Sequence, residues 1–111
     1  MDYQNIKSLE DFNQITEIQD AVLLYFSHEQ CNVCKVLKPK IAELVNNEFS
    51  NIGLYYSDTV LQPEIAGQNS IFTVPTLVVY FMGKESIRKS RNIGLDELRQ
   101  ALQRPYDMIF G

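Results

Sequence analysis

Hydrophobic positions along the chain follow two different periodicities. Segments 8–18, 34–49 and 95–103 place apolar residues at intervals of three and four, as amphipathic helices do. Segments 21–26 and 76–81 are apolar throughout, which is typical of strands that are covered on both faces of a sheet. Weaker patterns predict the remaining elements: strands at 51–57 and 86–91, a helix at 60–66 and a short strand near 3–6.

Several residues indicate where these elements begin and end. Ser8 is placed to cap the first helix, and Asp11 stands at the position of a capping box. Gly67 is expected to end the short helix, and residues 82–85 are expected to form a tight turn between the last two strands. Pro105 has no backbone N–H group, so we expect it to stop the last helix.

The order of the elements predicts the fold class. Helices and strands alternate, which is the pattern of an α/β domain, and the last two strands form a hairpin. We therefore expect three layers and a sheet that is parallel in one part, within a single domain over residues 1–111. The apolar tail, residues 106–111, is expected to fold back on this domain, with contact to a partner or a second copy as the alternative.

Charge and hydropathy weigh against some classes of function. The net charge is −4, and no basic stripe is present to neutralise phosphates, so we expect no nucleic-acid partner. A local basic cluster is interpreted as a solvated strand edge that discourages strand pairing: Lys84, Arg88, Lys89 and Arg91. No apolar run approaches the length of a membrane span. The first residues lack the pattern of a secretory signal, so we expect a cytoplasmic protein with reduced thiols.

The chain contains two cysteines, and they stand three positions apart. Cys31 and Cys34 lie between the apolar run 21–26 and the helix at 34–49. A thiolate is stabilised at the start of a helix, and two thiols so placed can exchange a disulfide with another protein. Zinc binding is the rival chemistry, but His28 is the only further ligand nearby, and a closed site would need a second chain. An incidental pair is the third reading.

The pair and a second motif resemble the thioredoxin family. The features that carry the resemblance are Cys31 and Cys34 between a strand and a helix, Pro39 five residues later, and Thr73-Val74-Pro75-Thr76 ahead of a buried strand. The interval from Cys31 to Pro75 is normal for the family, and the resemblance extends over nearly the whole chain. It implies the thioredoxin fold, a three-layer α/β/α arrangement with a central mixed sheet. Pro39 is expected to kink its helix.

The resemblance also implies an activity, which is the reduction of protein disulfides in the cytoplasm. Cys31 would attack the target, and the more buried Cys34 would resolve the mixed disulfide. Val74 and a cis Pro75 would face the pair and bind an extended segment of the substrate. The partners expected are protein disulfides and an unidentified reductase or low-molecular-weight thiol. No cofactor, metal, nucleic acid or membrane is expected.

This chain departs from the family pattern around the pair. The family usually has a tryptophan before the first cysteine and Gly-Pro between the two, where this chain has Gln30 and Asn32-Val33. Tyr25 replaces the family's buried acid, and a phenol with a pKa of about 10 is a poor base for the second thiol. His28 could assist, although we interpret it as an exposed loop residue. These departures favour one alternative, a non-catalytic thioredoxin-fold binding module.

Overall fold

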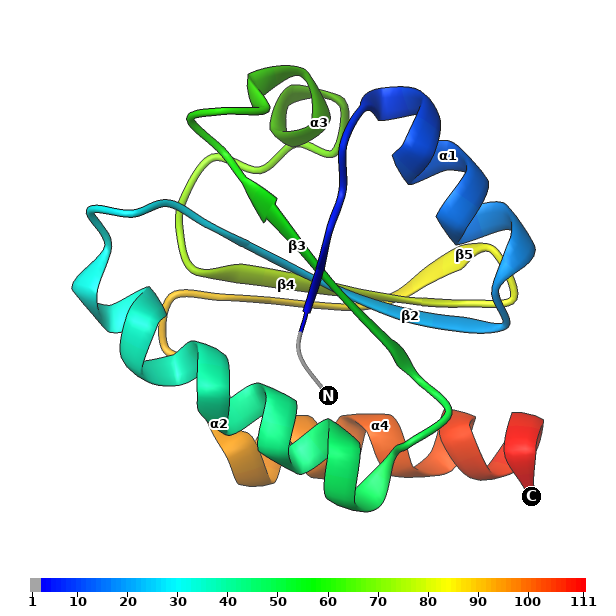
Figure 1. Ribbon diagram of the computed structural model, residues 1–111. Coiled ribbons are helices and arrows are strands. Elements are labelled where there is room, and N and C mark those ends of the chain that lie inside the picture. The colour runs from blue at the N-terminus through cyan, green and yellow to red at the C-terminus, as the bar shows by residue number, and fades with distance from the viewer. Residues whose placement is uncertain (1–2) are drawn as a thin grey trace.

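Strands and helices alternate along the chain in the predicted order (Figure 1). The computed structural model describes residues 3–111. Its elements are β1 (Gln4–Asn5), α1 (Leu9–Ile18), β2 (Ala21–Ser27), α2 (Asn32–Glu48), β3 (Gly53–Asp58), α3 (Pro63–Gln68), β4 (Thr76–Phe81), β5 (Lys84–Ser90) and α4 (Leu95–Phe110). The predicted positions of the two apolar strands and of the three long helices are confirmed, with errors at some ends.

The described residues form one mixed sheet with the strand order β1-β3-β2-β4-β5. Strands β1, β3 and β2 run parallel, whereas β4 is antiparallel to both β2 and β5. Every residue of β2 and β4 is buried because these strands have neighbours on both sides and helices on both faces. Strand β5 is a largely exposed edge, so Lys84, Arg88 and Lys89 of the basic cluster lie on a strand edge as predicted.

The sheet separates two layers of helices. Helices α1 and α3 cover one face, and α2 and α4 cover the other (Figure 1). Successive residues of β2 point to opposite faces, so Leu23 and Tyr25 pack with α2 and α4, and Leu24 packs with α1 and α3. The chain therefore has the expected three-layer thioredoxin fold, with a core on each side of the sheet.

Helix α1 begins as predicted. The Ser8 hydroxyl accepts a hydrogen bond from the Asp11 N–H group at 3.0 Å. The Asp11 carboxylate accepts one from the N–H group of Lys7, also at 3.0 Å. A capping box would place this second bond on Ser8, so the carboxylate here reaches one residue further back.

Helix α4 does not stop at Pro105, contrary to prediction, but continues to Phe110. A proline inside a helix removes one hydrogen bond, and the packing of the following turn outweighs that loss. The ring of Tyr106 lies 5.1 Å from that of Phe49, and its hydroxyl accepts a hydrogen bond from the Asn51 N–H group at 3.1 Å. Together with Ile109, these residues bury the tail against the domain, which confirms that it folds back.

Other boundaries also differ from prediction. Helix α3 begins at Pro63 and includes Gly67, since the Asp58 carboxylate accepts the N–H groups of residues 60 and 61 and holds them in a turn. The hairpin turn is only Met82 and Gly83, both with positive φ, so β5 pairs from Lys84 onward. Helix α2 begins two residues earlier than predicted, at the cysteine pair.

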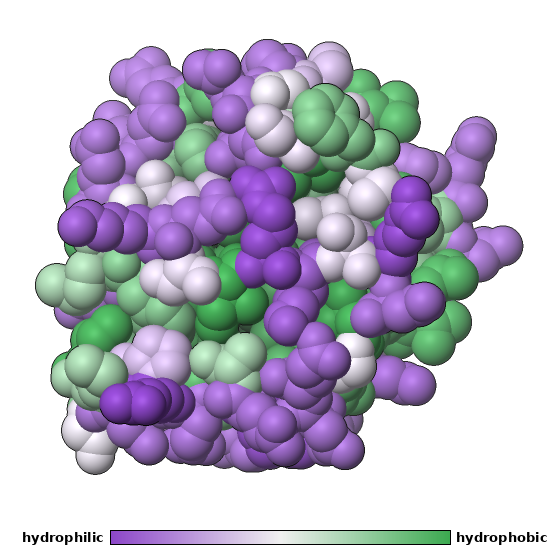
Figure 2. Space-filling model, turned by 180° about the vertical axis from the view of Figure 1, so that it is seen from behind, coloured by the Kyte–Doolittle hydropathy of each residue, from purple (hydrophilic) through white to green (hydrophobic). Residues whose placement is uncertain are grey.

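Much of the face turned away from the viewer in Figure 1 is hydrophilic, with apolar side chains exposed between polar ones (Figure 2). The large exposed apolar side chains are Ile18, Val33, Val36, Val60, Leu61, Phe72, Met82 and Met108. Most of them fall in the first turns of α2 or in the loops at 59–62 and 69–75. These segments adjoin the cysteine pair.

Candidate active site

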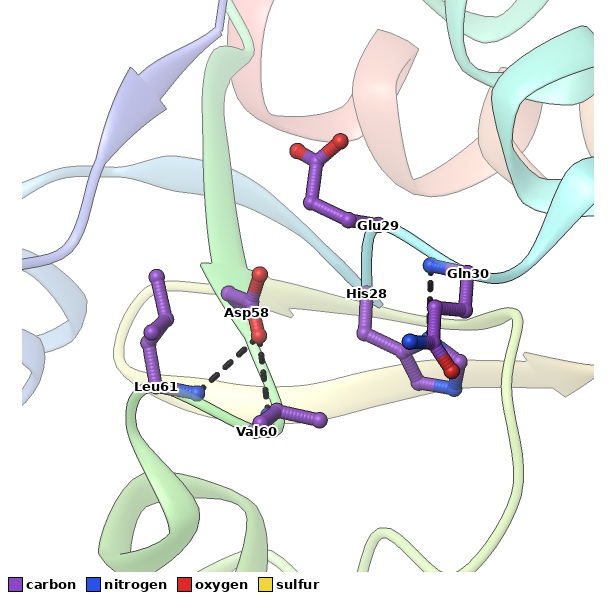
Figure 3. Close-up of a pocket in the computed structure, with 6 residues that line it drawn as sticks. All are labelled: His28, Glu29, Gln30, Asp58, Val60 and Leu61. Atoms are coloured by element: carbon purple, nitrogen blue, oxygen red, sulfur yellow. Dashed lines mark hydrogen bonds between the residues drawn. The ribbon is translucent and has the colours of Figure 1, made fainter.

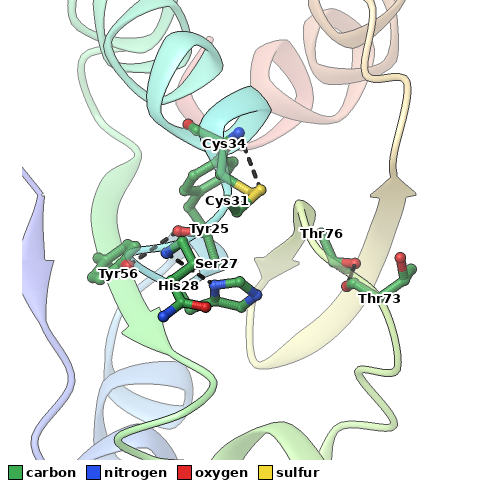
Figure 4. Close-up of a disulfide and its surroundings, with 9 residues drawn as sticks. Tyr25, Ser27, His28, Cys31, Cys34, Tyr56, Thr73 and Thr76 are labelled. Atoms are coloured by element: carbon green, nitrogen blue, oxygen red, sulfur yellow. Dashed lines mark hydrogen bonds between the residues drawn. A yellow bond between two sulfur atoms is a disulfide. The ribbon is translucent and has the colours of Figure 1, made fainter.

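Cys31 and Cys34 lie at the start of α2, immediately after the loop that leaves the central strand β2 (Figure 4). Their sulfurs form a disulfide, with the two Cα atoms 5.3 Å apart. Cys31 is the N-cap of the helix, and Cys34 belongs to its first turn. A pair separated by one helical turn can therefore open and close its disulfide without unwinding the helix.

The two sulfurs lie in different environments. Cys31 is half-buried, whereas Cys34 is 1% exposed, so a target can reach only the first sulfur. The Cys31 sulfur accepts a hydrogen bond from the Cys34 N–H group at 3.2 Å. The unpaired N–H groups and the dipole at a helix start both stabilise negative charge. The geometry thus favours a thiolate on Cys31 once the disulfide is reduced.

Tyr25 lies against the buried side of the pair. Its side chain is fully buried, and its hydroxyl donates a hydrogen bond to the Cys34 carbonyl at 2.9 Å. Burial raises the pKa of Tyr25, and the neighbouring Tyr56 raises it further. No Asp or Glu among residues 3–111 is buried. Because this phenol stays protonated and donates, it is unsuited to accept the proton of the Cys34 thiol.

Tyr25 belongs to a tyrosine cluster with Tyr3 and Tyr56, whose rings lie 5.9 and 6.5 Å from its own. The Tyr3 hydroxyl donates a hydrogen bond to the Lys38 carbonyl at 2.7 Å. The ammonium group of Lys38 lies 3.7 Å from the centre of the Tyr56 ring, a favourable cation–π contact. The Ser27 hydroxyl bonds to that of Tyr56. Tyr25 thus attaches the first turn of α2 to the central strand, and Tyr3 attaches the next turn to the segment before the edge strand β1.

Strand pairing places the loop before β4 beside the loop that leads to the cysteine pair. Phe26, near the end of β2, pairs with Thr76 at the start of β4, so the adjoining loops leave the sheet side by side. The Val74–Pro75 peptide bond is cis. Val74 and Cys31 both pack against the core between the sheet and α2. The Pro75 carbonyl accepts a hydrogen bond from the Arg91 N–H group at 2.8 Å, which fixes the loop to the end of β5.

Hollows flank the pair on both sides. One of about 400 Å³ is lined by His28, Glu29, Gln30, Asp58, Val60 and Leu61 (Figure 3). Another of about 600 Å³ lies between α2 and the end of β5, with Val33 and Gly94 among its lining residues. His28 is half-buried rather than exposed, and its Nδ1 atom accepts the Gln30 N–H group. A third hollow joins His28 to Val74.

Two further observations bear on other functions. None of the helices in residues 3–111 combines the length and the apolar character that crossing a membrane requires. In the same part of the chain, no three His, Cys, Asp or Glu side chains are grouped as metal ligands would be.

The thioredoxin family model matches residues 4–104. The chain belongs to the thioredoxin family. It is 34% identical over 88 residues to thioredoxin-like protein YdfQ of Bacillus subtilis, a match over 79% of this chain and 78% of that protein. It is 30% identical over 89 residues to the thioredoxin of Mycoplasma pneumoniae, covering 80% and 83% of the two chains.

Solved thioredoxin structures have the same fold. The oxidized mitochondrial thioredoxin 3 of Saccharomyces cerevisiae matches with a TM-score of 0.82 and 18% identity, over 91% of this chain and 93% of that one. The thioredoxin of Malassezia sympodialis matches with a TM-score of 0.83 and 23% identity, over 96% and 95%. Membership of the thioredoxin family together with the Cys31–Cys34 pair supports thiol–disulfide oxidoreductase chemistry.

Cys31 and Cys34 form the expected pair, and Val74 belongs to the same core cluster as both cysteines and precedes Pro75 in the loop before β4. Sequence reasoning missed the attachment of Tyr25 and Tyr3 to α2. The position of Tyr25 was a signal, since a polar side chain in a fully buried strand requires a hydrogen-bond partner. The sequence could not predict which group accepts this hydrogen bond, because the acceptor is a backbone carbonyl of another element, helix α2.

Proposed function

We propose that this protein reduces disulfides in other proteins by cycling between the Cys31/Cys34 dithiol and its disulfide. One observation carries the proposal. The sulfur of Cys31 is accessible and caps the helix, whereas the sulfur bonded to it is buried one turn further on. One cysteine is thus suited to attack, and the other to resolve.

The exchange has two steps. The Cys31 thiolate attacks one sulfur of a target disulfide, so a Cys31–target bond forms and the other target sulfur leaves as a thiolate. Cys34 then gives up its thiol proton and attacks the Cys31 sulfur. The Cys31–Cys34 bond forms, and the second target sulfur leaves. The target gains two electrons and takes up two protons from water, while the protein becomes oxidised.

Val74 and Pro75 are the proposed binding residues for the target. An extended target segment would pair with the backbone of Val74 and lie beside the sulfurs. Val33 is 64% and Phe72 89% exposed, and they would provide apolar contacts on either side. The partners are therefore proteins that present a disulfide within an extended, partly apolar segment.

A reductase or a low-molecular-weight thiol would return two electrons to the disulfide. A cytoplasmic location suits this direction of exchange, since the thiol pools there keep dithiols reduced. We also propose that the chain acts as a single domain over residues 1–111, since the family match spans nearly all of it.

Trapping tests this proposal. Cys34→Ser stops the second step, so mixed disulfides with target proteins should accumulate through Cys31. Cys31→Ser is the matched control and should trap none. The wild-type protein should reduce insulin disulfides when dithiothreitol is supplied, and neither variant should do so efficiently. If the wild type is inactive and Cys34→Ser captures no target, the proposal fails in favour of a non-catalytic binding module.

A further inference from the structure

Tyr25 connects the second cysteine to the central strand. Its hydroxyl donates to the carbonyl of Cys34 at 2.9 Å, and neither side chain is reached by solvent to any extent. The residue that closes the disulfide is therefore fixed to the sheet through its own backbone. A buried hydrogen bond of this kind is lost only at the cost of an unsatisfied partner.

The first turn of α2 is weakly attached to the rest of the helix. In a regular helix the Lys35 carbonyl would accept the N–H group four residues later, which belongs to Pro39. Proline has no N–H group, so this bond is missing. The segment that carries both cysteines thus lacks one of its links to the following turns. The Tyr25 hydroxyl attaches this segment from the sheet, at the residue before the gap.

Tyr25 fills the space beside the disulfide without adding charge. Burial raises the pKa of Tyr25, so its hydroxyl remains a donor. No Asp or Glu in residues 3–111 is buried there to take a proton from the Cys34 thiol. What Tyr25 gives the second cysteine is position rather than a base.

We propose that Tyr25 is a positioning residue for the resolving step of the exchange. The inference rests on the proposed dithiol cycle. In the mixed disulfide, Cys31 is bonded to the target, and no covalent bond joins it to Cys34. The end of the helix is then free to fray. The Tyr25 hydrogen bond holds the Cys34 backbone where its sulfur can reach the Cys31 sulfur, and this preserves the advantage of an intramolecular attack.

A small aromatic disulfide, dithionitrobenzoate, separates the two steps. The Cys31 thiolate cleaves the reagent, bonds to one half and releases the other as a coloured thiolate. The Cys34 thiolate then displaces the second half from Cys31, forming the internal disulfide and a second coloured thiolate. Stopped-flow absorbance therefore reports each attack as its own phase.

Tyr25→Phe removes the hydroxyl and keeps the ring. Tyr3→Phe is a matched control, because that hydroxyl donates to the Lys38 carbonyl, one turn further along the same helix. Both variants lose one hydrogen bond between the sheet side and α2. Only the first loses it at the cysteine pair, so a general loosening of the fold would affect the two variants alike.

The second phase should slow about fivefold in Tyr25→Phe, the factor expected for one net hydrogen bond. The first phase should be unchanged, and Tyr3→Phe should alter neither. The ratio of variant to wild-type rates should be the same across neutral and mildly alkaline pH, because Tyr25 positions and does not titrate there. In equilibrium with glutathione, Tyr25→Phe should form its internal disulfide less readily.

The proposal is wrong if Tyr25→Phe resolves as fast as the wild type, or if Tyr3→Phe slows resolution equally. Absence of the first phase in the wild-type protein would instead overturn the proposed function, since it would mean that Cys31 is not a nucleophile. Thermal unfolding of both variants checks that each is folded at the temperature of the kinetics.

Discussion

The two faces of the sheet hold their helices in different ways. On one face, α1 and α3 pack through apolar side chains such as Phe12. The hydroxyls of Tyr55 and Tyr80 there bond to the side chains of two helix-capping residues, Gln19 and Asn69, and not to helix carbonyls. On the other face, Tyr3 and Tyr25 donate directly to carbonyls of α2. Apolar packing fixes a helix approximately, and directed hydrogen bonds fix its backbone. The tyrosine bonds to helix carbonyls lie on the face that carries the disulfide.

The largest effect should come from the apolar face. Phe12→Ala removes a ring that is 8% exposed and should lower the free energy of unfolding by about 3 kcal/mol, the usual cost of such a cavity. Urea denaturation measures this loss. Because Phe12 packs on the face opposite the pair, the rate at which Cys31 is alkylated in the folded protein should not change. A large change in that rate would show that the two faces are not independent.

A smaller loss of stability is expected at the end of α4. Tyr106→Ala removes the ring that packs on Phe49 and the acceptor of the Asn51 N–H group. Since Tyr106 is only half-buried, the loss should be about 2 kcal/mol in urea denaturation. Tyr106→Phe keeps the ring and should recover most of it. If Tyr106→Ala is as stable as the wild type, the turn after Pro105 does not stabilise the helix by packing.

Alkaline pH should sharpen the comparison between the faces. Burial raises the pKa of Tyr80 to about 12 and that of Tyr25 further still. Because the pKa of each tyrosine is raised in the folded protein, the unfolded chain loses that proton at a lower pH. The stabilisation that the two tyrosines give the folded state is therefore complete below a pH of about 10 and is lost as the pH rises above it. The wild-type protein should therefore become less stable as the pH rises beyond that value.

Tyr25→Phe and Tyr80→Phe should each make this alkaline loss shallower, and Tyr25→Phe should have the greater effect. For each variant, urea denaturation at neutral pH and above pH 10 gives the change in the free energy of unfolding with pH. The order of the effects follows from burial, since Tyr25 is wholly inaccessible and Tyr80 is 8% exposed. If the free energy of unfolding changed equally with pH in the two variants, the expected order of the effects would be wrong.

The smallest effect is expected at the exposed edge strand β5. Hydrogen bonds from the Arg88 guanidinium hold the pKa of Glu85 below its usual range. Because the pKa of Glu85 is lowered in the folded protein, its carboxylate stabilises the folded state at neutral pH. This stabilisation is lost as the pH falls through the folded pKa. Water screens this pair because its side chains are 33% and 40% exposed. Glu85→Gln should therefore leave the free energy of unfolding in urea unchanged. A clear decrease would show that this ion pair on the edge strand stabilises the fold.

The parts of the fold that were predicted correctly have strong local patterns. The continuous apolar runs of β2 and β4 and the helical spacing around Ile41 and Leu44 needed no tertiary information. The cysteine pair and the Val74–Pro75 loop were found because a motif and its spacing identified the family. The fold class could thus be inferred from the sequence, as could the position of the two cysteines at the start of α2 and the cis Val74–Pro75 bond before β4.

The errors arose where distant contacts override local preference. Pro105 is a helix breaker by itself, but the packing of Tyr106 on Phe49 spans more than fifty residues of sequence and keeps the helix intact. The bond from Tyr3 to the Lys38 carbonyl also joins residues far apart in the sequence, 35 positions from one another. His28 was expected in an exposed loop and is half-buried because three loops converge around it.

The most direct test of the central claim is the order in which the two thiols react. The reduced protein is treated with limiting iodoacetamide near neutral pH, and the labelled peptides are identified by mass spectrometry. The accessible sulfur that caps α2 should react first, so the label should appear on Cys31 well before Cys34, and faster than on a free cysteine. Equal labelling, or labelling of Cys34 first, would contradict the assignment of Cys31 as the attacking thiolate.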